Sequence, residues 1–174
     1  MARHGDGVDV LRRALKAFGS GSPWHDRLSR ALLDPGVGIH LGVFVEPYLQ
    51  AILDGRKTVE SRFGRNRHAP FARVSPGDII LLKRSGGPVV GIAVAGRTDY
   101  YALDVETLSD IRRRFASRLF AEDDDFWSAR ADKRFATLIE LADRVGIGTL
   151  FVEKRDRRGW LTYRGGQPCL SLAA

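Results

Sequence analysis

Apolar side chains recur along the chain with two spacings, and the change from one to the other divides the sequence. In residues 1–35 the spacing is three or four residues, which predicts amphipathic helices. The first has Val8, Leu11, Leu15 and Phe18 on its apolar side, and the second, opened by Ser22-Pro23, has Trp24, Leu28, Ala31 and Leu32. Two helices this short cannot hold a core alone. We therefore expect 1–35 to be an N-terminal helical extension that packs on the main domain, with homodimerisation as an alternative role.

From Val37 onward the pattern becomes one of strands. Alternation predicts a strand over 39–45, and a short helix follows over 47–54. Residues 79–82 are apolar on both faces, as in a strand buried within a barrel, and the turn at 85–88 leads into a further strand over 89–98. Asp104 caps a helix that carries a stripe of apolar side chains through Leu119.

The last third predicts a strand over 136–141 and a hairpin over 151–163 folded about Arg157-Arg158-Gly159. Together these elements indicate an α+β fold, a small mixed β-barrel over 36–174 with flanking helices and the N-terminal extension.

The segment Gly55 to Arg62 is the candidate site. Gly55 suits the left-handed turn that ends a helix, and the chain then continues as a strand. Alternation along that strand puts Glu60 and Arg62 on one face, with Lys57 at the turn before them. Two opposite charges on one face beside a lysine are a possible binding or catalytic site.

Charge strengthens this interpretation. The formal net charge is +7 at pH 7, and it is concentrated in two segments. Residues 55–73 carry six basic side chains against Glu60, and residues 154–164 carry five against Asp156. Clustered arginine is typical of proteins that bind a polyanion such as RNA, although surface arginines are also common in proteins that bind nothing specific.

Composition excludes other classes. A single cysteine, Cys169, rules out an intramolecular disulfide, and the four histidines show no metal-ligand spacing. The acidic run Glu122 to Asp125 is more typical of a solvated helix start than of a metal site. No run is apolar and long enough to cross a membrane, and the polar start is unlike a signal peptide. We expect a cytoplasmic bacterial protein without a metal or other cofactor.

The pattern Gly55, Lys57, Glu60, Arg62 resembles the signature of the ASCH (activating signal cointegrator homology) family. The context agrees, because a strand and short helix precede the motif and Pro76-Gly77-Asp78 opens the next buried strand. The resemblance covers about 39–152. It implies a PUA-like β-barrel and a cleft, lined by the motif, that recognises RNA or a modified nucleoside.

The resemblance also implies two possible activities. Some family members are amidohydrolases that remove the acetyl group from acetylated cytidine, and a nuclease activity is ascribed to others. The amidohydrolases use a lysine at the position of Lys57, a threonine three residues later, and a glutamate from the helical insertion. Here Glu60 stands at the threonine position and Thr58 directly follows the lysine. The resemblance therefore makes Lys57 and Glu60, with Thr58, the candidate catalytic residues.

The residues themselves leave the chemistry open. As a base or nucleophile, Lys57 would need its pKa of about 10.4 lowered by burial or neighbouring positive charge. Otherwise Lys57 and Arg62 bind phosphate or a base edge. Glu60 has three candidate roles: an ion pair to Arg62, an acceptor for an exocyclic amine, or a general acid/base.

Further nucleic-acid contacts are predicted outside the motif. Arg65 and Arg67 lie on a loop beside it and suit phosphate contact or plain solvation. Tyr100 ends a strand, where it would stack on a base or fill the core. Arg157 and Arg158 would contact the backbone of a nucleic acid or form a plain hairpin turn. The sequence thus favours an RNA- or nucleotide-binding domain, with a hydrolase acting on acylated nucleosides or on RNA as the alternative.

Overall fold

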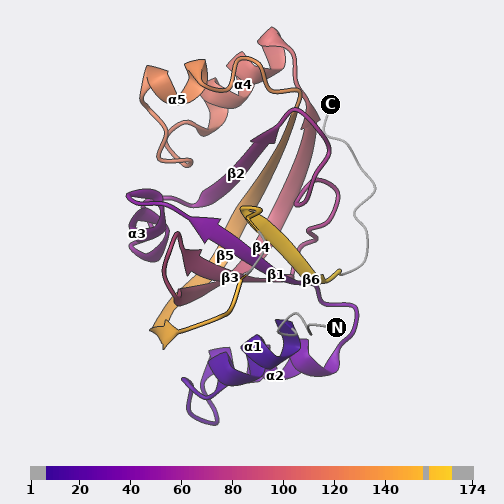
Figure 1. Ribbon diagram of the computed structural model, residues 1–174, viewed down its shortest axis with the longest axis vertical. Coiled ribbons are helices and arrows are strands. Elements are labelled where there is room, and N and C mark those ends of the chain that lie inside the picture. Colours follow the sequence, from indigo (N-terminus) through magenta and orange to yellow (C-terminus); the bar gives the residue numbers. More distant parts are fainter. Residues whose placement is uncertain (1–6, 155–156, 166–174) are drawn as a thin grey trace.

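The computed structural model describes residues 7–154 and 157–165 of the chain. Its centre is one six-stranded sheet with the order β2-β5-β4-β3-β1-β6, curved into a half-barrel (Figure 1). The strands are β1 (Ile39–Phe44), β2 (Val59–Gly64), β3 (Ile79–Arg84), β4 (Val89–Ala102), β5 (Phe135–Leu150) and β6 (Trp160–Arg164). The helices are α1 (Gly7–Leu15), α2 (Pro23–Leu33), α3 (Tyr48–Leu53), α4 (Val105–Phe115) and α5 (Asp124–Ser128).

Strand β3 is apolar on both faces because helices cover both faces of the sheet. Ile79 and Leu81 face a core shared with α1 and α2, whereas Ile80 and Leu82 face a core shared with α3. The parallel pairing of β1 with β3 places Leu41 beside Leu81, so the same alternation continues into β1. The predicted packing of the N-terminal helices on the main domain is confirmed, and their apolar sides are buried against this chain's own sheet.

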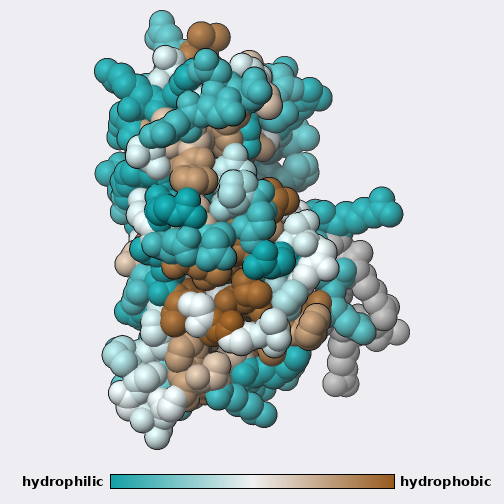
Figure 2. Space-filling model, turned by 90° about the vertical axis from the view of Figure 1, so that its left-hand side faces the viewer, coloured by the Kyte–Doolittle hydropathy of each residue, from teal (hydrophilic) through white to brown (hydrophobic). Residues whose placement is uncertain are grey.

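Helices α4 and α5 lie at the opposite end of the molecule from α1 and α2 (Figure 1). The side chain of Asp104 accepts a hydrogen bond from the backbone of Thr107, as predicted for the cap of α4. Apolar residues of this end, including Val59 of β2 and Trp127 of α5, form a third core. The face shown in Figure 2 is mostly hydrophilic at this end, in agreement with the three arginines in the last turn of α4.

A buried polar network joins the entries of β1 and β3. The carboxylate of Asp78 accepts hydrogen bonds from the backbone N–H groups of Gly38 (2.7 Å) and Ser75 (2.8 Å). It also contacts Nε2 of His40 at 3.0 Å, and Nδ1 of His40 lies 3.1 Å from the hydroxyl of Thr162 on β6. The proline-glycine-aspartate turn thus has a structural purpose, since Asp78 satisfies three donors from the entries of the two strands.

Two predicted elements are corrected by the structure. The predicted hairpin over 151–163 is wrong, because β6 pairs antiparallel with β1 and not with the segment before it. Strand β5 extends from Phe135 to Leu150, well beyond the predicted end at Leu141, because its second half continues the ladder with β4. The barrel is therefore open, with β2 and β6 as its two edges.

Among the helices that the structure describes, none combines the length and the apolar character needed to span a bilayer.

Candidate nucleotide-binding cleft

A sharp turn after α3 places the motif. Gly55 has a φ of +82°, the left-handed region predicted for it, and a Cβ there would lie 2.2 Å from a guanidinium nitrogen of Arg144. The backbone N–H of Lys57 then donates to the carbonyl of Ala51, which ties the turn to the helix. From Val59 the chain pairs with β5, with Glu60 opposite Ile139. Helix, glycine turn and strand together fix where the charged side chains point.

Lys57 is buried, with 3% of its surface exposed. Its Nζ donates to the backbone carbonyls of Val59 (2.7 Å) and Leu119 (3.1 Å), and it lies 3.3 Å from the Glu60 carboxylate. These three acceptors match the three N–H bonds of an ammonium group. A neutral amine has only two N–H bonds, so deprotonation of Lys57 in this arrangement would leave one acceptor without a donor.

Burial lowers the pKa of Lys57 from its ordinary value, and the positive charges of Arg62 and Arg130 act in the same direction. The Glu60 carboxylate opposes them by stabilising the ammonium form. The site thus has the burial that a reactive lysine requires, but its contacts are those of an ammonium group that anchors a carboxylate.

Arg62 connects the two edges of the open barrel. Its Nε donates to Glu60 at 2.6 Å, which confirms the predicted ion pair. Its two terminal nitrogens reach across to the carbonyls of Val43 at the end of β1 (3.0 Å) and Gly159 before β6 (3.1 Å). The guanidinium carbon also lies 5.3 Å from the ring centroid of Trp160. This fixed cation bridges the gap between β2 and the β1–β6 edge.

A cavity of about 310 Å³ opens beside this bridge and is called the motif pocket here. Its lining comprises Val43, Phe44, Val45, Tyr48, Lys57, Glu60, Ser61, Arg62, Phe63, Phe126 and Arg130. The motif supplies the charged floor, β1 and α3 supply one wall, and α5 with the residues after it supplies the other. Four aromatic rings and three cations thus surround one buried carboxylate.

Arg130 is the cation that the motif does not contain. Its guanidinium carbon lies 3.4 Å from the ring centroid of Phe126 and 5.4 Å from that of Phe63. One terminal nitrogen donates to the carbonyl of Phe126 at 2.6 Å. Its Nε is buried and has no hydrogen-bond partner among the described residues. Burial lowers the pKa of Arg130, yet an arginine stays charged at neutral pH. Arg130 therefore adds a charged guanidinium to the lining of the motif pocket, and one of its N–H groups is buried without an acceptor in the described part of the chain.

The other predicted site residues lie outside the motif pocket. The hydroxyl of Thr58 accepts a hydrogen bond from Arg118, away from the pocket. The side chain of Tyr100 is buried (2% exposed) and its hydroxyl is bonded to the backbone of Val74, so its ring has no free face for a base. The prediction that Tyr100 stacks on a base is therefore wrong, because its ring is buried in the core.

The four arginines predicted to contact phosphate are exposed, and none lines the motif pocket. Arg65 forms an ion pair with Asp132, and Arg67 lies with its guanidinium 4.9 Å from the ring centroid of Phe135. Arg157 and Arg158 lie in the segment that leads into β6. Phosphate contact by these four arginines stays a prediction.

Sequence reasoning missed Tyr48, Phe126 and Arg130. The local pattern indicates no more for Tyr48 than a place in the short helix over 47–54, and it assigns no site role to Phe126. The one available signal was the spacing of four between Phe126 and Arg130, which brings the two onto the same face of a helical segment.

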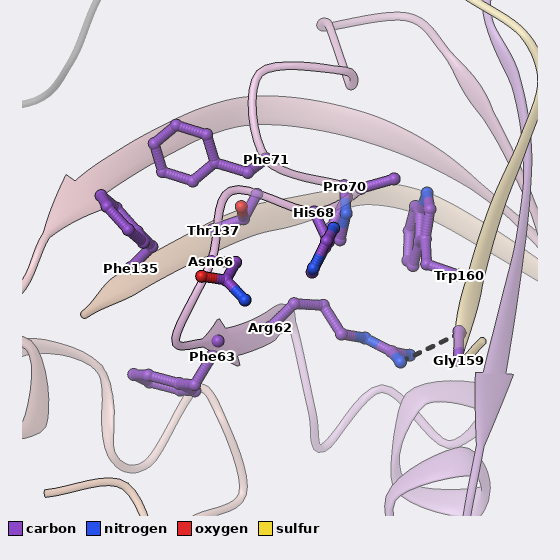
Figure 3. Close-up of a pocket in the computed structure, with 12 residues that line it drawn as sticks. Arg62, Phe63, Asn66, His68, Pro70, Phe71, Phe135, Thr137, Gly159 and Trp160 are labelled. Atoms are coloured by element: carbon purple, nitrogen blue, oxygen red, sulfur yellow. Dashed lines mark hydrogen bonds between the residues drawn. The ribbon is translucent and has the colours of Figure 1, made fainter. Parts of the chain in front are cut away.

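A second cavity, of about 230 Å³, adjoins the first and is called the loop pocket here (Figure 3). It shares Arg62 and Phe63 with the motif pocket. The rest of its lining is Gly64, Asn66, His68, Ala69, Pro70, Phe71, Phe135, Thr137, Gly159 and Trp160. The structure thus has two adjoining pockets that share one cationic boundary. Among the described residues, no group of three or more His, Cys, Asp or Glu could hold a metal ion.

The sequence matches no protein-family model and no curated protein. Solved structures do match. The ASCH protein from Zymomonas mobilis aligns at a TM-score of 0.53 with 18% identity, over 67% of this chain and 74% of that one. A single-substitution variant of the same protein aligns at 0.54 with 18% identity, over 67% and 76%. Because these structures align over two thirds of the chain at this level, the chain has an ASCH-type fold.

Proposed function

We propose that this protein binds single-stranded RNA, or a nucleotide derived from it, in the motif pocket. One observation carries the proposal: Lys57, Arg62 and Arg130 surround Glu60 in a cavity whose walls are aromatic. Cations suit the phosphate, and aromatic rings suit an unstacked base, which single-stranded RNA presents and a duplex does not.

Glu60 and Arg130 provide the polar recognition in this proposal. The Glu60 carboxylate is held by Lys57 and Arg62, so it is an oriented acceptor for an exocyclic amine of a base. The charged guanidinium of Arg130 lines the pocket, and such a group donates to a base carbonyl or a phosphate oxygen. The ASCH-type fold agrees with this assignment, and the net charge of +7 favours a polyanionic ligand.

The test is equilibrium binding of labelled single-stranded RNA at about 50 mM and about 200 mM salt. We expect binding that weakens steeply with salt, because phosphate contacts release counterions. Arg130→Ala should weaken binding at least tenfold, equivalent to about 1.4 kcal/mol. The matched control is Arg12→Gln, which removes an exposed positive charge on α1 at the other end of the molecule. Salt-independent binding, or an equal loss in both variants, would refute the motif pocket as the site.

A second candidate function is hydrolysis of acylated nucleosides or of RNA through Lys57. It is favoured by the burial of Lys57 and the lowered pKa of its amine. The three acceptors around Nζ oppose it, since a nucleophile needs a free lone pair. In the hydrolytic form of the proposal, one proton of the Lys57 ammonium passes to the Glu60 carboxylate, which leaves a neutral amine with a lone pair.

Incubation with a panel of acylated cytidines and with labelled RNA tests this second function. Turnover should disappear in Lys57→Met, which keeps an unbranched side chain of similar length but has no amine. A cooperative unfolding transition in urea, measured on the same variant, separates loss of chemistry from loss of the fold. Turnover that persists in Lys57→Met would exclude Lys57 as the reactive group.

A further inference from the structure

A single nucleotide bound in the motif pocket makes no use of the loop pocket. The lining of the loop pocket is nevertheless suited to a second nucleotide. Figure 3 shows Asn66 and His68 between the rings of Phe71 and Phe135 on one side and Trp160 on the other. An amide and an imidazole offer donors and acceptors for the edge of a base, and the rings offer apolar faces. Aromatic rings thus line both pockets, although the polar groups differ and most of the residues come from different segments.

The two pockets meet at Arg62, which is immobilised. Three of its N–H groups donate to Glu60, Val43 and Gly159, and the ring of Trp160 lies beside its guanidinium. Because these acceptors fix the plane of the guanidinium, the remaining N–H groups keep a constant direction. The side chain is 23% exposed, so an anion at the boundary can reach it. A phosphate that links two nucleotides would lie at this boundary.

A second cation, Arg67, contacts two aromatic rings that line the loop pocket. The guanidinium of Arg67 is held 4.9 Å from the ring centroid of Phe135 and 5.7 Å from that of Phe71, both of which line the pocket. Arg67 is exposed and is placed for the next phosphate along a strand. Arg130 thus lines the motif pocket, Arg62 lines both pockets, and Arg67 contacts two aromatic rings of the loop pocket.

We propose that the loop pocket is a second subsite, which takes the nucleotide adjacent to the one in the motif pocket. The ligand is then a single-stranded segment of at least two linked nucleotides and not a free nucleoside. This inference rests on the proposed function, because it assigns the first nucleotide to the motif pocket.

The experiment compares four dinucleoside monophosphates (ApA, CpC, GpG and UpU) with the four nucleoside 5′-monophosphates, as competitors of a labelled RNA oligomer. A dinucleoside monophosphate carries one phosphodiester charge, fewer than the charge of a terminal phosphate. Tighter binding of the dinucleotide therefore cannot result from charge. We expect the best dinucleotide to bind about tenfold to a hundredfold more tightly than its mononucleotide, the gain of one stacked base.

Variants assign that gain to the loop pocket. Asn66→Ala and His68→Ala change exposed side chains on the loop after β2, so the fold should persist. Each should reduce dinucleotide affinity toward that of the mononucleotide and leave mononucleotide affinity unchanged. Arg130→Ala, in the motif pocket, should weaken both ligands together, and Arg12→Gln should change neither.

The outcomes separate the two proposals. If no nucleotide or oligomer binds, the proposed function fails and the second subsite fails with it. If mononucleotides and dinucleotides bind equally, the function stands and the second subsite is overturned. If the loop variants weaken both ligands equally, the loop contributes to the first pocket, and the second subsite is again overturned.

Discussion

Lys57 shows how much a single residue depends on its surroundings. In the sequence it is one of several cations in a basic segment, with an ordinary pKa. In the fold it is buried between Glu60 and the carbonyls of Val59 and Leu119. Burial of a charge is tolerated only where partners compensate for lost hydration, and these three acceptors do so.

Replacing Lys57 should therefore destabilise the protein. In Lys57→Met the Glu60 carboxylate keeps only Arg62, and two buried carbonyls lose their donor. Breaking a buried pair costs about 3–5 kcal/mol, so we expect a loss of that order in the free energy of unfolding, measured with urea. Lys16→Met makes the same substitution at an exposed position. It should change the free energy of unfolding by less than about 0.5 kcal/mol. Equal effects in the two variants would contradict the anchoring role.

The lowered pKa of Lys57 also predicts a pH dependence. The folded-state pKa lies below the ordinary value of 10.5, so between the two values the unfolded chain binds more protons. The free energy of unfolding should then rise with pH in that window, by at most about 1.4 kcal/mol per pH unit. The difference between the wild type and Lys57→Met, followed as the pH rises toward 10.5, isolates this contribution. A difference that stays flat or falls with pH would contradict it.

At the scale of elements, a few polar side chains hold strands in their places. Asp78 joins the entries of β1 and β3, and through His40 it reaches β6. Arg62 joins the opposite edges of the sheet in the same way, from β2 to the end of β1 and the start of β6. Both residues connect segments that are far apart in sequence, so their importance is not visible from local pattern.

Removing the carboxylate of Asp78 should weaken this junction. Asp78→Ala leaves two backbone N–H groups and the His40 ring without their acceptor, and each orphaned buried group costs about 1–3 kcal/mol. We expect a total loss of about 3 kcal/mol or more in chemical unfolding. Asp132→Ala is the comparison, because it removes an exposed partner of Arg65 and Lys133 and should cost about 1 kcal/mol or less. If both variants lost a similar free energy of unfolding, the burial of Asp78 would not explain its contribution to stability.

At the scale of the molecule, the N-terminal helices belong to the core. Leu11 and Leu28 are fully buried and share a cluster with Leu41 and Leu81 of the sheet. Arg27 of α2 pairs with Asp143 of β5 at 2.6 Å, which adds a polar contact to the apolar one. A division of the chain at residue 35 would expose this face of the sheet. Homodimerisation through these helices stays a prediction, and it would have to use their outer sides.

Two leucines of α2 test this organisation. Leu28 is fully buried and Leu33 is 84% exposed. Leu28→Ala should lower the free energy of unfolding by about 2–5 kcal/mol, because it leaves a cavity between helix and sheet. Leu33→Ala should change it by less than about 0.5 kcal/mol. If Leu28→Ala were as mild as Leu33→Ala, the helices would have to be an independent appendage.

The sequence by itself determined the parts that depend on local pattern. Periodicity located both N-terminal helices, the doubly apolar strand at Ile79 and the helix after Asp104, and the glycine at 55 predicted the turn that places the motif. Alternation along one strand was sufficient to pair Glu60 with Arg62. These features depend on neighbours within a few residues, whose backbone geometry is restricted by sterics and hydrogen bonding.

Only the tertiary structure decided which distant segments share a surface. It brought Arg130 into the motif pocket, paired β6 with β1 and not with the preceding segment, and buried Tyr100 in the core. Such placements depend on the closing of long loops and on the packing of whole faces, which no short window of sequence encodes. The charges of the site were readable in the chain, but the burial that alters Lys57 and the two pockets around Arg62 exist only in the fold.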